Sequence, residues 1–439
     1  MKKIGIMTLG CRVNQYESQA IAEGLERLGY CIVSFSDDCD VYIINTCTVT
    51  SESDRKSKQM IGRALARKKD NSEIIVCVIG CYTQNKMQIE KNAEALFKDG
   101  IDFIGGNTDK SRLPQLLHEY ISSQNNQKVN ILTNIDNVGD FEDITVKKSN
   151  NVRAFLKVQD GCNNFCTYCI VPRVRGRIRS KSIENVKNDL IGLRNSGYEE
   201  VVFCGIEISS YGNDGGDSLL TLAELAQELG FKRVRFGSLN PIVFSENFTR
   251  KLSQIKVVMP HFHLSVQSAS SRVLSVMGRK YDSGQLKKCV ENIYKYFEHV
   301  TLSCDIICGF PGETTEDFEE TAAFIKSNEI IHAHIFPYSK RLGTPAAEFP
   351  NQHTNKTKKE RCAALSHIAF EKKKYIYEAQ VGKKVTVLIE NFKSGYWFGH
   401  TEKFLPVAIK KDCKPGEFVQ VTLENNFDFI SDEYCFIIE

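Results

Sequence analysis

Three cysteines lie in the stretch GCNNFCTYC, residues 161 to 169, at Cys162, Cys166 and Cys169. Thiolates bind soft metals, and zinc usually takes four protein ligands in a structural site. The next cysteine is Cys204, and no histidine lies in between. A cubane cluster has four irons, so three thiolates can hold it and leave one iron open. The spacing therefore favours an iron–sulfur cluster with one open iron, and zinc is the alternative.

A second trio of cysteines is spread along the first hundred residues. Cys11, Cys47 and Cys81 directly follow the apolar runs ending in TLG, INT and VIG. The carboxyl ends of strands in an open parallel sheet face one crevice. We therefore expect these thiols to meet there and to hold a second metal cluster, with buried structural thiols as the alternative. Cys31, Cys39 and Cys77, inside or beside strands, are expected to be core thiols.

Short apolar strands alternate with amphipathic helices over residues 1–125. We expect strands at 3–9, 41–46, 74–80 and 101–106, with helices near 15–28, 52–69 and 84–97. Strands this apolar indicate an open parallel α/β sheet covered on both faces. The polar segment 126–147 is expected to be a linker.

Six further β/α units fill residues 148–375 and indicate a partial (β/α)6 barrel. Their strands are expected near 152–158, 200–204, 232–238, 260–266, 300–308 and 331–337, and a basic helix near 356–379 follows them. Cys162, Cys166 and Cys169 come just after the first of these strands, where barrel sites lie. Residues 376–439 alternate with period two and predict a small β-barrel.

The composition is that of a soluble protein. The 439 residues are 42% hydrophobic and 25% charged, with a net charge of +3. We expect no signal peptide and no membrane span, and so a cytoplasmic protein, most simply a monomer. Sixteen cysteines in that compartment are better read as metal ligands and buried thiols than as disulfides.

The two cysteine patterns together match a known family. The cysteine spacing with Tyr168 resembles the radical S-adenosylmethionine superfamily, and nearly the whole chain resembles the radical S-adenosylmethionine methylthiotransferases. LGCRVNQYES and INTCTVTSESDRKSKQ are similar to the branch that modifies N6-threonylcarbamoyladenosine at position 37 of tRNA. Gly382, Glu390, Gly399, Thr401 and Gly416 resemble a TRAM domain.

The resemblance implies cofactors and partners. Two 4Fe–4S clusters would be held by the two cysteine trios, and S-adenosylmethionine would serve as methyl donor and as radical source. The product would carry a 2-methylthio group. The reaction implies a tRNA substrate, a sulfur source and an electron donor such as flavodoxin. Contacts to S-adenosylmethionine are implied for Tyr168, Gly205, Glu207, Ser265, Gln267, Ser268 and Gly309.

Basic residues are candidates for RNA contacts. Arg173, Arg175, Arg177 and Arg179 alternate, so in an extended segment they would share one face and could hold phosphates. The alternative is that some of them pair with nearby carboxylates. Arg55 and Lys56 begin the helix after Cys47 and could meet the threonyl carboxylate. Lys403 is a candidate through the tRNA-binding role that the TRAM resemblance implies.

Three other functions stay open at this point. Two are enzymatic: methylthiolation of isopentenyladenosine in tRNA, or of an aspartate in a ribosomal protein. The third is a non-catalytic, metal-stabilised RNA-binding protein.

Overall fold

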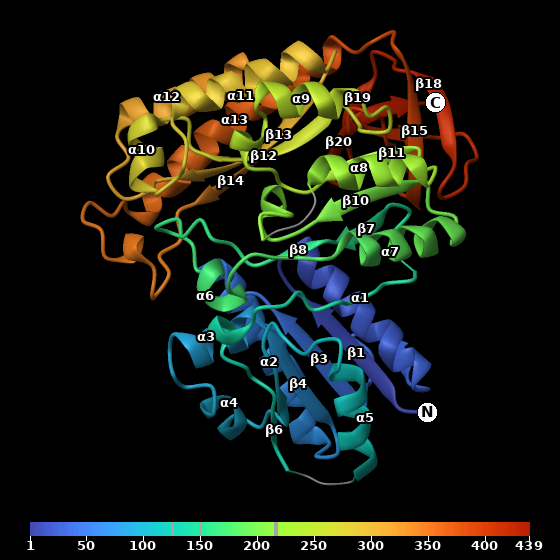
Figure 1. Cartoon of the computed structure of the whole chain (residues 1–439), viewed down its shortest axis with the longest axis vertical. Helices are drawn as coiled ribbons and strands as arrows, with labels where there is room; N and C mark the ends of the chain where they lie inside the picture. The colour runs from blue at the N-terminus through green and yellow to red at the C-terminus, as the bar shows by residue number, and fades with distance from the viewer. Residues whose placement is uncertain (124–126, 149–150, 215–217) are drawn as a thin grey trace.

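The N-terminal part is a parallel sheet of six strands in the order β2-β1-β3-β4-β5-β6 (Figure 1). The computed structural model describes residues 1–123, 127–148, 151–214 and 218–439. The strands are β1 (Lys3–Thr8), β2 (Cys31–Val33), β3 (Val41–Thr46), β4 (Ile75–Gly80), β5 (Phe103–Ile104) and β6 (Val129–Asn130). Every residue of β3 is buried, as expected for a central strand with both faces covered. The predicted open parallel sheet is confirmed.

Helices cover this sheet, and one predicted helix is wrong. The helices are α1 (Arg12–Arg27), α2 (Ser51–Asp70), α3 (Cys81–Gln88), α4 (Ala95–Lys98) and α5 (Leu113–Ser123). The helix expected over 84–97 is two short ones, because the chain turns at Lys91, whose φ is 53°. Apolar periodicity alone does not reveal such a break.

The segment expected to be a linker has structure of its own. β6 comes from residues 126–147 and pairs with β5, and η1 (Ile135–Asn137) follows it. Ile144 and Val146 are buried in the core of the central part. The segment therefore packs against both parts of the molecule that it joins.

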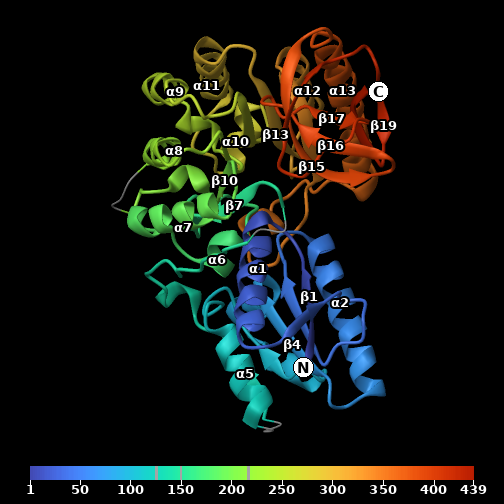
Figure 2. The same ribbon diagram turned by 90° about the vertical axis from the view of Figure 1, so that its right-hand side faces the viewer.

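The central part has six barrel strands in two three-stranded sheets. Figure 2 shows this part above the N-terminal sheet and beside the C-terminal strands. One sheet has the order β11-β10-β7 and the other β12-β13-β14, and a single parallel bridge between Leu239 and Leu264 links them. The strands are β7 (Ala154–Lys157), β10 (Glu200–Cys204), β11 (Arg233–Phe236), β12 (His261–Gln267), β13 (Thr301–Cys308) and β14 (Ile330–Pro337). All six predicted strands are present, and they form a partial barrel.

Helices begin at well-capped positions around these strands. The side chains of Ser182, Ser218, Ser245, Asp282, Thr314 and Thr354 accept backbone N–H groups at helix starts. The helices are α6 (Val171–Arg175), α7 (Ile183–Asn195), α8 (Leu219–Glu228), α9 (Glu246–Ser253), α10 (Ser271–Val276), α11 (Ser283–Tyr296), α12 (Thr315–Ser327) and α13 (Asn355–Glu378). Shorter elements are β8 (Gln159–Asp160), β9 (Arg179–Ser180), η2 (Ile208–Ser210), η3 (Pro241–Val243) and η4 (Pro345–Ala347).

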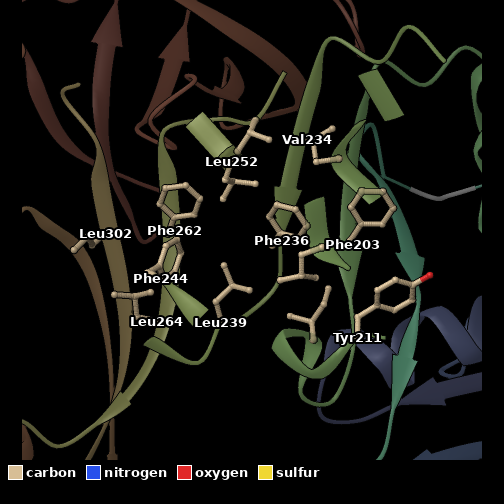
Figure 3. Close-up of a cluster of buried hydrophobic side chains, with 14 of the residues drawn as sticks. Phe203, Tyr211, Val234, Phe236, Leu239, Phe244, Leu252, Phe262, Leu264 and Leu302 are labelled. Carbon is tan, nitrogen blue, oxygen red and sulfur yellow. The ribbon is translucent and has the colours of Figure 1, made fainter. Parts of the chain in front are cut away.

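One large core joins the barrel strands to their helices. Figure 3 shows Phe236 of β11 and Phe262 and Leu264 of β12 within this buried cluster. Along β12, buried residues alternate with partly exposed ones, so Phe262, Leu264 and Val266 pack into the core. His261, His263, Ser265 and Gln267 therefore lie on the opposite, inner face of the strand.

The C-terminal part is a six-stranded sheet in the order β18-β15-β16-β17-β20-β19. Its strands are β15 (Lys384–Lys393), β16 (Tyr396–His400), β17 (Pro406–Ile409), β18 (Phe418–Thr422), β19 (Phe427–Ile430) and β20 (Glu433–Ile438). The all-strand prediction is confirmed, but no pairing joins the end strands β18 and β19 within residues 376–439, so the barrel is not closed. This sheet docks on the central part through Phe404, whose ring stacks on His261 with centroids 4.8 Å apart.

Candidate active site

Cys162, Cys166 and Cys169 lie in the loop between β8 and α6. The loop is fixed by backbone hydrogen bonds, from Cys162 N to Gly176 O (3.0 Å) and from Cys169 N to Cys166 O (2.9 Å). Burial, reinforced by Cys166, raises the pKa of Cys162 to about 11 and that of Cys169 to about 12. These thiols are therefore close enough for their charges to interact, and a metal that binds them must displace their protons.

Cys11, Cys47 and Cys81 also come together, at the carboxyl ends of β1, β3 and β4. Burial raises the pKa of Cys47 to about 11, and the nearby Cys81 and Cys11 add to this rise. Gly10, with φ of 93°, permits the close approach, since a Cβ there would lie 2.7 Å from Cys47 Sγ. Cys11 is solvent-accessible, yet enough protein surrounds it that burial raises its pKa as well. The sheet thus gathers three distant cysteines in one crevice.

The two trios face a shared junction between the N-terminal and central parts. Cys81 packs against Ile170 and Val174, which directly follow the Cys162–Cys169 loop. Asn107 links the two sides, because its Nδ2 donates to Cys81 Sγ (3.3 Å) and to Val174 O (2.8 Å). The N-terminal trio is therefore joined directly to the segment that follows the second trio.

A buried ionic cluster holds the two sides of this junction together. It consists of Glu17, Lys110, Lys157, Asp160 and Arg175. Arg175 Nη1 lies 2.9 Å from Glu17 Oε1 and 3.1 Å from Asp160 Oδ2, and Lys157 Nζ lies 2.7 Å from Glu17 Oε1 and 2.6 Å from Asp160 Oδ2. Lys110 also bonds to Glu17. Glu17 belongs to α1 and Asp160 to β8, so these ion pairs join the N-terminal and central parts.

The expected row of arginines on one face is wrong. Residues 171–175 form α6 rather than an extended segment. Arg175 is buried in the ionic cluster, and buried Arg179 donates to Arg175 O (2.9 Å) and lies 4.0 Å from Asp160. The alternative of pairing with carboxylates therefore applies to these two. Arg173 and Arg177 are exposed, and Arg177 covers the ring of Phe165 at 4.5 Å.

The other basic candidates differ in their exposure to solvent and in their hydrogen-bond partners. Arg55 and Lys56 are exposed near the start of α2, and Arg55 pairs with Glu52 at 2.6 Å. Lys403 is only partly exposed at the junction of the C-terminal sheet with the barrel, where its Nζ donates to Gln380 Oε1 (3.0 Å). RNA contacts by Arg55, Lys56, Lys403, Arg173 and Arg177 stay predictions.

Glu207 is the feature that best fits S-adenosylmethionine. It follows β10, its Oε2 accepts from Asn164 Nδ2 (3.0 Å), and its Oε1 is buried with no hydrogen-bond partner among the described residues. Burial raises the pKa of Glu207, which Arg279 and more weakly Ser209 and Asn240 oppose. A buried carboxylate oxygen without a partner is suited to receive an ammonium group.

Gly205 fixes the backbone next to Glu207. A Cβ on Gly205 would lie 2.7 Å from Gln159 Oε1, and that oxygen accepts from Glu207 N at 2.8 Å. The absence of a side chain at Gly205 therefore allows the chain after β10 to approach Gln159, whose hydrogen bond fixes the backbone of Glu207.

The remaining predicted cofactor residues lie around the open end of the barrel. Ser265 O accepts from Arg279 Nη2 (2.9 Å), and Arg279 Nη1 also donates to Cys166 Sγ (3.7 Å). Gln267 has φ of 65°, unusual for a non-glycine residue and frequent at functional sites. Tyr168 stands edge-on to Phe310.

Ser268 and Gly309 have structural roles in this arrangement. Ser268 is buried, and its Oγ lies 3.4 Å from Thr321 Oγ1. Gly309 has φ of 68°, and a Cβ there would lie 2.6 Å from Lys358 Cγ of α13. The need for glycine at 309 thus comes from its backbone and from α13. Contact of either residue with adenosine stays a prediction.

Three family descriptions match successive parts of the chain. They are uncharacterized protein family UPF0004 over residues 3–99, the radical SAM superfamily over residues 156–325 and the TRAM domain over residues 378–425. A threonylcarbamoyladenosine tRNA methylthiotransferase, MtaB, of Aquifex aeolicus is 37% identical over 88% of this chain and 92% of its own. The chain belongs to the radical S-adenosylmethionine methylthiotransferase family. The superfamily match implies a 4Fe–4S cluster and S-adenosylmethionine.

Two further relatives show the breadth of this methylthiotransferase family. The MtaB protein of Bacillus subtilis is 34% identical over 100% of this chain and 98% of its own. A protein of Pelotomaculum thermopropionicum named tRNA-2-methylthio-N(6)-dimethylallyladenosine synthase is 36% identical over 96% of this chain and 95% of its own. Relatives with different named substrates are thus about equally similar to this methylthiotransferase.

A solved structure supports the fold alone. The radical S-adenosylmethionine methyltransferase TsrM of Kitasatospora setae aligns with a TM-score of 0.55 at 13% identity, covering 79% of this chain and 75% of TsrM. Among the described residues of this methylthiotransferase, no helix has the length and apolar character to cross a bilayer.

Some residues of the methylthiotransferase site were missed by sequence reasoning. Arg279 lies far from the cysteines in sequence and carried no motif, yet it contacts Cys166. Gln159 and Asn107 are polar residues that come shortly after β7 and β5, and only their position near strand ends could have drawn attention to them. Glu17 lies within the quoted stretch LGCRVNQYES, but its buried charge partners come from distant segments.

Proposed function

We propose that this enzyme adds a 2-methylthio group to N6-threonylcarbamoyladenosine at position 37 of tRNA. The observation that carries the proposal is the pair of cysteine trios at one junction, in a chain that matches the MtaB relatives over most of its length. Two trios suit a reaction that needs a sulfur-bearing centre and a radical source close together.

The protein's own residues have distinct roles in this proposal. Cys162, Cys166 and Cys169 hold one 4Fe–4S cluster, and Cys11, Cys47 and Cys81 hold a second. When bound, the cofactors supply the methyl group, the sulfur and the radical needed because C2 of adenine has no leaving group. Glu207 receives the ammonium of S-adenosylmethionine. The ionic cluster fixes the N-terminal part against the central part, so that the two trios stay in a constant relative position and water is excluded between them.

The exposed cations and the TRAM domain bind the tRNA. Arg55, Lys56, Arg173 and Arg177 are exposed on both sides of the junction and can neutralise phosphates. The threonyl carboxylate is a second possible partner for Arg55 or Lys56. We further propose a cytoplasmic monomer supplied by an electron donor such as flavodoxin and by a separate sulfur source, with domains at 1–125, 148–375 and 376–439 joined by 126–147.

Iron content and product formation together test the proposal. We expect anaerobically reconstituted protein to hold about eight irons, and a variant with Cys11, Cys47 and Cys81 changed to alanine to hold about four. Mass spectrometry of nucleosides should detect the 2-methylthio product only with the parent protein. Cys31→Ala, outside both trios, is the matched control and should keep both the iron and the product.

Two results would count against this function. One is product formation by the triple variant. The other is a parent protein that modifies only tRNA carrying the dimethylallyl group, which would favour the activity named for the Pelotomaculum relative.

A further inference from the structure

A polar cluster on the inner face of the barrel belongs to neither cysteine trio. It consists of His263 of β12, Asp305 of β13 and His334 of β14, whose ligand-type atoms all lie within 4.8 Å of one another. The three strands are neighbours in one sheet, as Figure 1 shows. In the parallel register, Asp305 pairs with His334, and His263 pairs with Ser303, two residues before Asp305.

The cluster faces the interior of the barrel rather than the helices. His263 alternates with the core residues Phe262 and Leu264, and Asp305 with buried Cys304 and Ile306. Its side chains are partly open, with 20% of His263 and 23% of Asp305 exposed. These polar groups are therefore held in place and still accessible to a ligand.

The cluster combines hydrogen-bonding groups with flat rings. His263 Nε2 lies 3.0 Å from Asp305 Oδ1, and the rings of His263 and His334 stack with centroids 5.2 Å apart. Phe336, exposed by 46%, continues the stack at 6.3 Å from His334. Burial and then His263 lower the pKa of His334, which Asp305 opposes, so the neutral form of its imidazole is favoured. A neutral imidazole has one donor and one acceptor, and Nδ1 of His334 already lies 3.3 Å from His332 Nε2, so Nε2 is the nitrogen of His334 that is left for a ligand.

The cluster is connected to the proposed reaction centre along β12. Along β12, His263 is two residues, or about 7 Å, before Ser265. The Ser265 carbonyl bonds to Arg279, which also contacts Cys166. From the other trio, Cys11 lies close enough to Cys204, at the end of β10, for their charges to interact. The inner face of β12 thus leads from this polar cluster to the residues that contact the Cys162–Cys169 loop.

We propose that His263, Asp305 and His334 bind the polar N6 substituent of the target adenosine. This inference rests on the proposed function and names the residues that select its substrate. Asp305 accepts from a hydroxyl or a carbamoyl N–H group, and the two imidazoles donate to carbonyl or carboxylate oxygens. Phe336 provides a flat surface against which the base stacks.

The same cluster disfavours a hydrocarbon substituent. A dimethylallyl group has no polar atom, so it cannot replace the hydrogen bonds that the remaining donor and acceptor positions of His263, Asp305 and His334 make to water. Sites that hydrogen-bond their substrate can reject an analogue without the partner by about 10⁴-fold. Because His334 is exposed here, we expect a smaller factor, about tenfold or more for one residue.

The test compares two tRNAs that differ only in the substituent on adenosine 37, threonylcarbamoyl or dimethylallyl. His334→Phe keeps a flat ring in the stack but removes the donor and the acceptor. We expect kcat/KM for the threonylcarbamoyl tRNA to fall about tenfold or more, and that for the dimethylallyl tRNA to fall less or to rise. His334→Gln retains a donor and an acceptor and should retain most of the selectivity.

Controls separate this inference from the function on which it rests. His367→Phe makes the same change at an exposed position of α13 and should leave the ratio of the two kcat/KM values unchanged. An unchanged ratio in His334→Phe with normal cluster iron would overturn the inference alone. So would one equivalent of bound zinc lost in His334→Phe, because the cluster would then be a metal site. A parent protein that modifies neither tRNA would overturn the proposed function instead.

Discussion

At the scale of single residues, the site carries a buried charge that the ligand-free protein does not fully satisfy. Glu207 has one carboxylate oxygen without a partner among the described residues, and burial raises its pKa above the ordinary value of 4.5. For an acid with a raised pKa, the folded state binds the proton more tightly, so stability falls as the pH rises through that pKa. The residue thus costs stability at neutral pH and is positioned to recover it on binding a cation.

Glu207→Gln should separate the cost in stability from the contribution to cation binding. We expect the ligand-free variant to be more stable than the parent near pH 7 and to lose the pH dependence above 4.5. Loss of a charge-assisted hydrogen bond to the ammonium should weaken S-adenosylmethionine binding by about tenfold or more. Thermal unfolding across pH and equilibrium dialysis of the cluster-loaded protein measure the two quantities. An unchanged dissociation constant would remove Glu207 from the binding site.

At the scale of elements, α1, α6 and β8 depend on the buried ionic cluster for their mutual position. Arg175→Met would leave Glu17 and Asp160 with fewer partners, which typically costs about 3–5 kcal/mol of unfolding free energy. Denaturant titration of the parent and the variant measures this loss. Arg173→Met, on the exposed side of the same helix, should change stability by no more than about 0.5 kcal/mol. Similar losses in both variants would show that the charge cluster does not stabilise the junction.

The ionic cluster also predicts how the junction responds to acid. Burial alone would raise the pKa of Asp160, but Lys157 and Arg175 outweigh it and lower the pKa to about 2. A lowered carboxyl pKa gives stability that is present above the unfolded value of 3.8 and lost as the pH falls toward 2. Arg175→Met should therefore narrow the pH range over which the parts stay together, which acid titration of intrinsic fluorescence can follow.

The ends of the strands were predictable from the sequence because each strand is a short apolar run, which is a local pattern. The apolar runs placed β1, β3 and β4, and the cysteine after each run then followed from parallel topology. Tertiary charge pairing was not predictable in this way. Arg175 and Arg177 look alike in the sequence, yet one is buried against Glu17 and the other is exposed, because only the fold brings α1 against α6.

At the scale of the whole molecule, the two cysteine trios of the proposed reaction centre lie where the N-terminal and central parts meet. The start of α2, which follows Cys47, contacts the segment after β14, because Arg341 Nη2 lies 2.7 Å from Asp54 Oδ2 and Ser51 N donates to Ser339 Oγ (2.9 Å). The Cys81 side is tied to α6 through Asn107. The target nucleotide must therefore enter a junction whose two sides are joined by these contacts. The rest of the tRNA must lie on the outer surface around the junction.

Salt dependence of tRNA binding tests which cations on that surface touch phosphate. Removing one cation that binds a phosphate should reduce the slope of log K against log salt concentration by about 1. We expect this reduction for Arg173→Ala and Arg177→Ala, whose side chains are exposed beside the junction. Lys251→Ala, exposed on α9 at the other end of the central part (Figure 1), should keep the parent slope. Equal slopes for all three variants and the parent would mean that Arg173 and Arg177 bind no phosphate, leaving α2 and the TRAM domain to hold the tRNA.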